Sequence, residues 1–136
     1  ERKAVSQVMR PTTTIEPRAH LDAGTYLIKH YHDPALVVMT NGTQEPVATI
    51  TDADITKAIA DGLDPEDTHV SQVVTAKHAT VEADVAAEDA ARLMLSHGVD
   101  RLPVFEGQRL VGVVELADLR RMGVAPTPFA TAKSAS

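Results

Sequence analysis

The sequence predicts an α/β fold made of two β-α-β-β-α repeats packed with pseudo-two-fold symmetry. The first observation is a repeat: Val-Ser-Gln-Val at residues 5–8 returns, letter for letter, at residues 70–73. The second is that the same order of strand and helix signals follows each copy, as expected of an internal duplication. The third is length: half of a 136-residue chain buries little surface alone, so each unit gains stability from its twin.

The second copy gives the clearest element signals. Ala90, Leu93 and Met94 fall at helical spacing, and Gly98 follows them as a helix stop. We expect Pro103 at a sheet edge or at the start of a strand, because proline has no N–H to donate to a strand ladder. The expected elements are a strand at 79–81, a helix at 88–97, strands at 101–105 and 110–114, and a helix at 116–121.

The first copy repeats this order with small differences. A helical stripe ends at Tyr31, which we expect to pack against the sheet, and Asp54 falls in register with Asp118. The turn at residues 40–45 is longer than its counterpart. The expected elements are a strand at 14–15, a helix carrying residues 24–31, strands at 36–39 and 47–50, and a helix at 53–60.

These repeats predict the domain organisation of the chain. A tail rich in Pro, Ala, Thr and Ser is expected to be mobile. Because the chain begins with Glu-Arg-Lys rather than with Met, we expect it to be a fragment of something longer. The predicted segments are a first repeat at 4–62, a linker at 63–69, a second repeat at 70–123 and the mobile tail at 124–136.

Composition narrows the class of protein. A net charge of −6 disfavours non-specific binding to nucleic acid, which needs a basic face. No apolar run approaches the ~20 residues of a membrane span, and no signal-peptide layout is present. The absence of cysteine excludes disulfides and thiolate chemistry. We therefore expect a cytoplasmic protein with neither nucleic acid nor membrane as a partner.

Four motifs carry a resemblance to a known family, and they lie at residues 5–9 (VSQVM), 47–55 (VATITDADI), 97–105 (HGVDRLPVF) and 110–119 (LVGVVELADL). Over residues 4–122 the chain resembles a tandem pair of CBS domains, the regulatory unit called a Bateman module. The second copy fits the family well, including Gly112. The first copy departs from it, because it lacks the Leu-Pro-Val signature and Ala48 replaces the usual glycine.

The resemblance implies binding of an adenosine-containing ligand such as AMP, ATP, NAD or S-adenosylmethionine in clefts between the repeats. AMP or ATP is the candidate ligand, and no cofactor is required. In the family, a Thr or Ser and an Asp three residues later lie between the last strand and the closing helix. The residues expected at ribose or phosphate are Thr51, Asp54, Asp118 and Arg101. The aliphatic residues expected to line the adenine pocket are Ile15, Leu36 and Ile50.

The chemistry of Thr51 and Asp54 agrees with such a site. A carboxylate accepts two hydrogen bonds from a ribose diol, each contributing ~1.5–3 kcal/mol. A hydroxyl and the free N–H groups of a helix start can meet a phosphate or the sugar. The alternative is helix capping, because Thr and Asp are preferred N-cap residues and an acid in the first turn favours the helix dipole. Thr51 can fill both roles.

The two copies differ where a ligand would bind. Glu115 stands in the position of Thr51, and its carboxylate would repel a phosphate. Arg101 occupies a position where the family often carries a basic residue facing the phosphates, whereas its counterpart in the first copy is Ala35. A salt bridge at the edge of the sheet is the open alternative for Arg101. We expect one competent site and one degenerate site.

Other chemistries find little support in the sequence. No nucleophile has a base at a readable spacing, and no Gly-rich phosphate loop is present. His30 and His32 are two residues apart and do not share a helix face, so we expect no metal site. The leading hypothesis is a homodimeric regulatory module that is not an enzyme. The alternative is a dimerising scaffold or interaction module with degenerate sites, within a larger enzyme or transporter.

Overall fold

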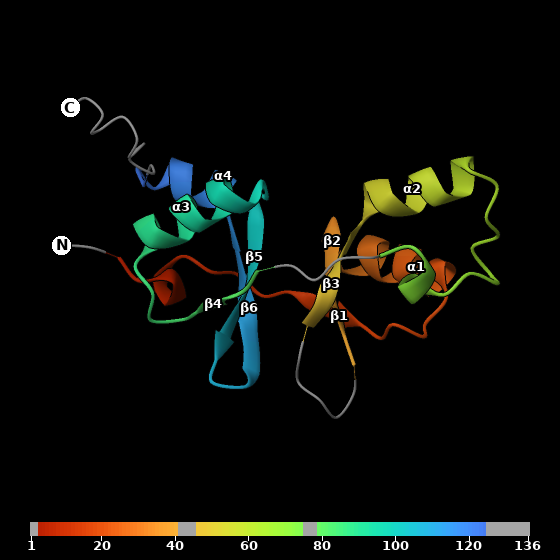
Figure 1. The fold of residues 1–136 in the computed structure, drawn as a ribbon, viewed down its shortest axis with the longest axis horizontal. Helices are drawn as coiled ribbons and strands as arrows, with labels where there is room; N and C mark the ends of the chain where they lie inside the picture. Colours follow the sequence, from red (N-terminus) through yellow and green to blue (C-terminus); the bar gives the residue numbers. More distant parts are fainter. Residues whose placement is uncertain (1–2, 41–45, 75–78, 125–136) are drawn as a thin grey trace. The chain divides into compact units, whose positions relative to one another are not determined.

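The computed structural model describes residues 3–40, 46–74 and 79–124 (Figure 1). The turn expected at residues 40–45 lies outside the described residues except for its first member. The predicted mobile tail also lies outside them, apart from Val124, which packs against an apolar core.

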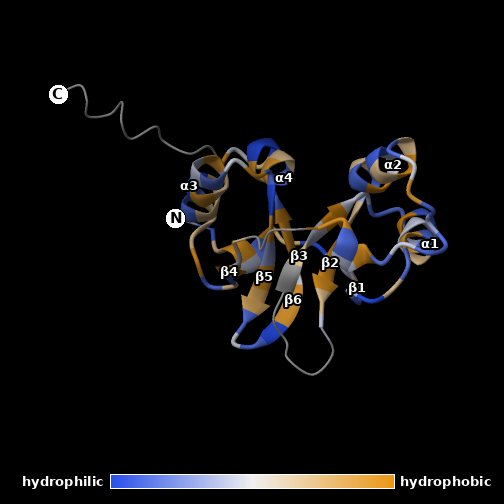
Figure 2. Cartoon of the chain, turned by 45° about the vertical axis from the view of Figure 1, so that its right-hand side comes forward, coloured by the Kyte–Doolittle hydropathy of each residue, from blue (hydrophilic) through white to orange (hydrophobic). Residues whose placement is uncertain are grey.

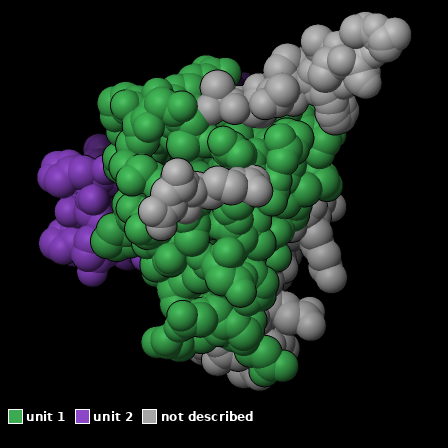
Figure 3. All heavy atoms as spheres, turned by 90° about the vertical axis from the view of Figure 1, so that its left-hand side faces the viewer, with its two compact units in different colours: residues 1–11, 79–136 green, residues 12–78 purple. Residues whose placement is uncertain are grey.

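The chain divides into two compact units, which Figure 3 shows in different colours. Unit 1 joins residues 1–11 to residues 79–136, and unit 2 consists of residues 12–78. The units therefore do not coincide with the predicted sequence repeats at 4–62 and 70–123. The difference arises from the segment that precedes each repeat, as described below.

Unit 2 contains the first β-α-β-β-α set. Its sheet has the order β1-β2-β3, with β1 and β2 parallel and β2 and β3 antiparallel. This order confirms the element sequence predicted for the first copy. The elements are β1 (Thr13–Ile15), α1 (Leu21–Tyr31), β2 (Ala35–Met39), β3 (Pro46–Thr51) and α2 (Asp52–Ala60).

Unit 1 repeats the plan. Its sheet has the order β4-β5-β6, again with one parallel and one antiparallel pairing. Both sheets are three-stranded, so the predicted mixed α/β class with two equivalent sets is confirmed. The elements are β4 (Val81–Glu82), α3 (Ala87–His97), β5 (Arg101–Glu106), β6 (Arg109–Glu115) and α4 (Leu116–Arg121).

Pro103 lies in the central strand of its sheet, so its expected place at an edge or a strand start is wrong. β5 runs between β4 and β6, and Pro103 is paired with Val113 of β6. The short strand β4 begins its register with β5 only where Val81 meets Val104. Proline is tolerated because no residue of β4 stands opposite it to require an N–H.

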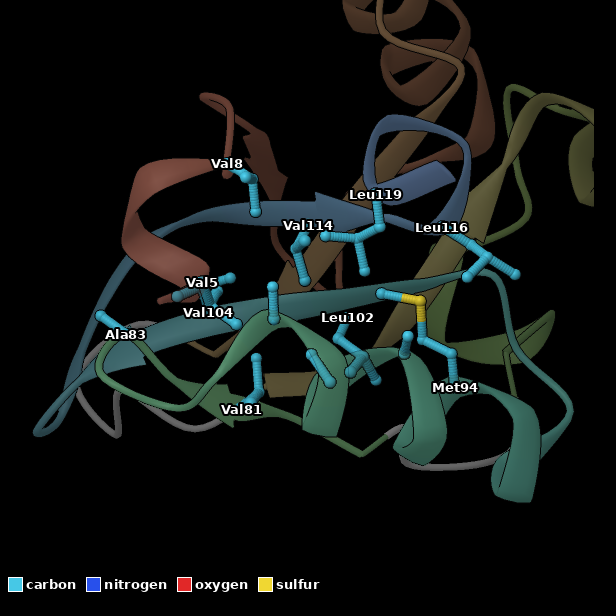
Figure 4. Close-up of a cluster of buried hydrophobic side chains, with 13 residues drawn as sticks. Val5, Val8, Val81, Ala83, Met94, Leu102, Val104, Val114, Leu116 and Leu119 are labelled. Atoms are coloured by element: carbon cyan, nitrogen blue, oxygen red, sulfur yellow. The ribbon is translucent and has the colours of Figure 1, made fainter. Parts of the chain in front are cut away.

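Each unit has an apolar core, and Figure 2 shows mostly hydrophobic strands beside helices of mixed character. In unit 1 the core gathers side chains from strands, both helices and the N-terminal segment, as Figure 4 shows for Val5, Met94 and Leu119. In unit 2 the buried members of the core are Ile15, Leu21, Leu36, Val38, Ile50, Ile55, Ala58 and Val70.

The duplicated segments, here called the lead-ins (residues 4–10 and 69–74), exchange between the repeats. The first lead-in precedes the first repeat but packs in unit 1. Its Val5 N–H donates to the carbonyl of Val85 at 2.8 Å. The second lead-in packs in unit 2, where the Val70 N–H donates to the carbonyl of Ala19 at 2.8 Å.

The structure explains why both lead-ins carry the same four letters. Val5 and Val70 are fully buried, each in the core of its unit. The side-chain carbonyls of Gln7 and Gln72 each accept from a backbone N–H three residues earlier, at 2.9 and 2.7 Å. Each tetrapeptide is thus a short 3-10 turn with one apolar anchor and one side chain that closes it.

The two long helices end alike, in the left-handed conformation. Gly98 ends α3 with a φ of 67°, which confirms it as a helix stop, and His32 ends α1 with a φ of 54°. Tyr31 is 57% exposed, so its expected packing role is wrong, and its ring instead lies edge-on to His30. No helix in the described part of the chain has the length and apolar character needed to cross a membrane.

Candidate functional site

The start of α2 carries the first predicted pair, Thr51 and Asp54. Thr51 is the last residue of β3 and the N-cap of α2. Its backbone N–H donates to Asp54 Oδ2 at 2.9 Å, and the Asp54 N–H donates to Thr51 Oγ1 at 3.1 Å. This capping box pairs two backbone N–H groups at the helix start and fixes both side chains. The capping role open to Thr51 is therefore present.

The capping box engages only one oxygen of Asp54. Its Oδ1 atom accepts no hydrogen bond from the residues that the structure describes. The residue is half-buried, so the carboxylate is held in one orientation while part of it stays accessible. A fixed carboxylate with an available oxygen is a prepared acceptor for a hydroxyl donor.

The corresponding carboxylate of unit 1, Asp118, is engaged through both oxygens. Arg10 donates from Nε to Oδ2 at 2.9 Å and from Nη2 to Oδ1 at 3.1 Å. Arg121 also donates to Oδ1. Only 10% of the Asp118 side chain is exposed, whereas 52% of the Arg10 side chain is exposed. In this arrangement, guanidinium groups engage both carboxylate oxygens of Asp118.

Arg101 and Glu115 form an ion pair across the sheet of unit 1. They stand opposite each other in the register of β5 and β6, and their side chains are 11% and 21% exposed. The salt bridge that was the alternative for Arg101 is thus present. Glu115 is the N-cap of α4 but makes no side-chain cap. The guanidinium beside it offsets the charge that was expected to repel a phosphate.

The three residues predicted to line an adenine pocket lie together in the core of unit 2. Ile15 is 5% exposed, and Leu36 and Ile50 are fully buried. Leu36 and Ile50 are also partners in the register of β2 and β3. A contact between adenine and these side chains would need the core to open, so this contact stays a prediction.

Arg10 is the site residue that sequence reasoning missed. It lies far from Asp118 in the chain, so no spacing or periodicity connects them. Its backbone N–H and carbonyl pair with Val113 at 2.9 Å in both directions. Gly112 allows this approach, because a Cβ there would lie 2.7 Å from the Arg10 carbonyl oxygen. The glycine at 112, replaced by Ala48 in the first copy, was the available signal.

The hydrogen bond and the charge of Asp61 raise the pKa of Lys57, and both side chains are exposed near the end of α2. Among the described residues, no group of three or more His, Cys, Asp or Glu side chains could hold a metal ion.

Fold and site together define a tandem α/β module with a carboxylate at the start of each closing helix. A family model described as CBS domain matches residues 70–124. CBS domain-containing protein YhcV of Bacillus subtilis is 32% identical over 107 residues, which cover 78% of this chain and 74% of YhcV. The chain belongs to the CBS-domain family, in agreement with the resemblance seen in its sequence.

Two further comparisons extend this result. Protein MK0525 of Methanopyrus kandleri is 30% identical over 90 residues, which cover 65% of this chain but only 46% of MK0525. The CBS domain pair of protein MJ0100, solved in complex with 5-methylthioadenosine and S-adenosyl-L-methionine, superposes with a TM-score of 0.78. The matched parts cover 90% of this chain and 97% of that one, and at 20% identity the likeness is one of fold.

Proposed function

We propose that this chain is a regulatory module in which the start of α2 binds an adenosine-containing ligand. The observation that carries the proposal is the available Oδ1 atom of Asp54, on a side chain that Thr51 holds in place. A ribose diol offers the hydroxyl donors that such a carboxylate accepts. The MJ0100 complex supports the ligand class, because that CBS pair was solved with two adenosyl compounds.

The charges near Asp54 favour an uncharged or cationic adenosyl ligand. Asp52 and Asp54 place two carboxylates in the first turn of α2, and neither has an ion-pair partner among the described residues. A phosphate would approach these charges on a chain whose net charge is −6. We therefore rank adenosine and S-adenosylmethionine above AMP, and AMP above ATP, which places the ligands favoured by the sequence last.

Thermal unfolding with and without ligand tests this proposal. A ligand that binds only the folded state stabilises it by ~2.7 kcal/mol at a hundredfold excess over its dissociation constant. We expect adenosine or S-adenosylmethionine to raise the unfolding midpoint of the wild type and to leave that of Asp54→Ala unchanged. Asp52→Ala is the matched control, because it removes the exposed neighbouring carboxylate and leaves the capping box intact. Equal midpoint shifts in wild type and Asp54→Ala would exclude the site.

A dimerising scaffold is the second candidate function, and exposed apolar side chains favour it. In unit 2, Tyr26 is 62% exposed, Tyr31 57% and Ile59 47%, all on α1 or α2. Large exposed apolar side chains that gather in one patch are typical of surfaces that other proteins cover. Sedimentation of the wild type and a Tyr26→Ser/Ile59→Ser variant would separate these functions. The scaffold function is supported if the wild type is a dimer, the variant is a monomer, and neither of them binds an adenosyl ligand.

A further inference from the structure

The carboxylate of Asp118 already has the partners that a ribose would supply. Two N–H groups of Arg10, fixed in one plane, donate to its two oxygens at 2.9 and 3.1 Å. A vicinal diol would present its two hydroxyl donors to a carboxylate in much the same way, one to each oxygen. The Arg10 guanidinium therefore stands in for a diol, and Arg121 supports it from α4.

The fold keeps Arg10 in this position. The lead-in that carries it is paired with Val113 and held by the close approach over Gly112. Because the guanidinium belongs to the same unit, its effective concentration at Asp118 is that of an intramolecular group, which a free ligand must outcompete. In unit 2 Asp54 has no such partner among the described residues.

We infer that unit 1 retains a latent nucleoside site at Asp118, which Arg10 holds closed. The inference rests on the proposed function, since it assigns to Asp118 the role proposed for Asp54. Two observations beyond the position of Asp118 carry it. Glu115 is paired with Arg101, so its charge does not bar an uncharged ribose. Removing Arg10 would leave Oδ2 available while Arg121 still holds Oδ1, which reproduces the half-engaged state of Asp54.

The test counts adenosine molecules bound per chain by isothermal titration. We expect one in the wild type, two in Arg10→Gln, and one in Arg10→Gln/Asp54→Ala, where only the opened site binds. Arg109→Gln is the matched control, because it removes an exposed arginine that pairs with Glu106, away from Asp118. Arg10→Lys keeps the charge but lacks the planar guanidinium that donates to both oxygens of Asp118. If Arg10→Gln fails to fold, Arg10→Lys takes its place in the same titration.

The outcomes separate the two proposals. If the wild type and Arg10→Gln each bind one adenosine and Arg10→Gln/Asp54→Ala binds none, the latent site is excluded and the proposed function stands. If the wild type binds none and Arg10→Gln binds one, the latent site holds and the site at Asp54 is wrong. If no folded variant binds adenosine, both are overturned. Two adenosine molecules on the wild type would exclude the closure by Arg10.

Discussion

At the start of α2, Asp54 gives one oxygen to the backbone of its own N-cap, whereas at the start of α4 Asp118 gives both oxygens to arginines. The two carboxylates occupy equivalent positions in equivalent units, three residues after the N-cap. Their surroundings differ because Thr51 closes a capping box and Glu115 does not. Duplication has thus kept the backbone and changed the partners.

The N-cap residue influences how the neighbouring carboxylate is used. Glu115 pairs with Arg101 on the adjacent strand, so it does not cap α4. Asp118 is then left to side chains from elsewhere in unit 1, and the first lead-in brings Arg10 to it. Substitutions that act on one unit and not on the other can test these differences.

Gly112→Ala should disturb the start of α4 most, because it acts on the backbone that carries Arg10. The added Cβ would lie 2.7 Å from the Arg10 carbonyl oxygen, and such overpacking costs about 2–3 kcal/mol of unfolding free energy. Denaturant unfolding measures the loss. The reverse change in unit 2, Ala48→Gly, should cost about 1.5 kcal/mol, through backbone entropy and the loss of a buried methyl group. Equal effects of the two changes would contradict the close approach at Gly112.

Val5→Ala and Val70→Ala test which unit each lead-in stabilises. Each removes two methyl groups from a fully buried side chain, which costs about 2 kcal/mol. We expect Val5→Ala to speed amide hydrogen exchange in α3 and β5, although Val5 precedes the first repeat. Val70→Ala should speed exchange in α1 and β2. Faster amide hydrogen exchange in α1 after the Val5→Ala substitution would show that the first lead-in does not pack in unit 1 in solution.

Asp54→Ala should have the smallest effect on folding, because it removes one half of an N-terminal cap. Such losses cost about 1 kcal/mol of unfolding free energy. Asp54→Asn should cost less, since an amide oxygen can still accept from the N–H of Thr51. Thermal unfolding without ligand measures both changes. A loss above about 3 kcal/mol would mean that Asp54 has a structural role beyond its cap.

Much of the fold could be predicted because its signals are local. The helix stop at Gly98 and the closing helix at residues 116–121 follow from turn chemistry and apolar spacing. The prediction for Pro103 was wrong because it depends on the length of β4. That strand is too short to place a residue opposite Pro103, so no backbone N–H is needed there, and a short apolar run does not reveal where a strand begins. The packing predicted for Tyr31 was wrong because helical spacing locates an apolar stripe without showing where along the helix the packed surface ends.

The candidate site was predictable only in part. Thr51 and Asp54 could be found, because a cap and a carboxylate three residues apart form a readable local pattern and the family resemblance implies a ligand role for that pattern. The ion pair between Arg101 and Glu115 could be anticipated only as an alternative, since its formation depends on strand register. Arg10 could not be found, because Gly112 indicates a close approach of backbone without showing which distant segment of the chain makes it.

The sequence alone is enough to predict a duplicated β-α-β-β-α module with a carboxylate at the start of each closing helix. These properties depend on short-range periodicity, turns and caps, which act between neighbours in the chain. Two further properties become visible in the folded chain: each lead-in packs with the other repeat, and Asp118, unlike Asp54, has both oxygens engaged. Those outcomes depend on contacts such as that of Arg10 with Asp118, which exist only once distant segments have come together.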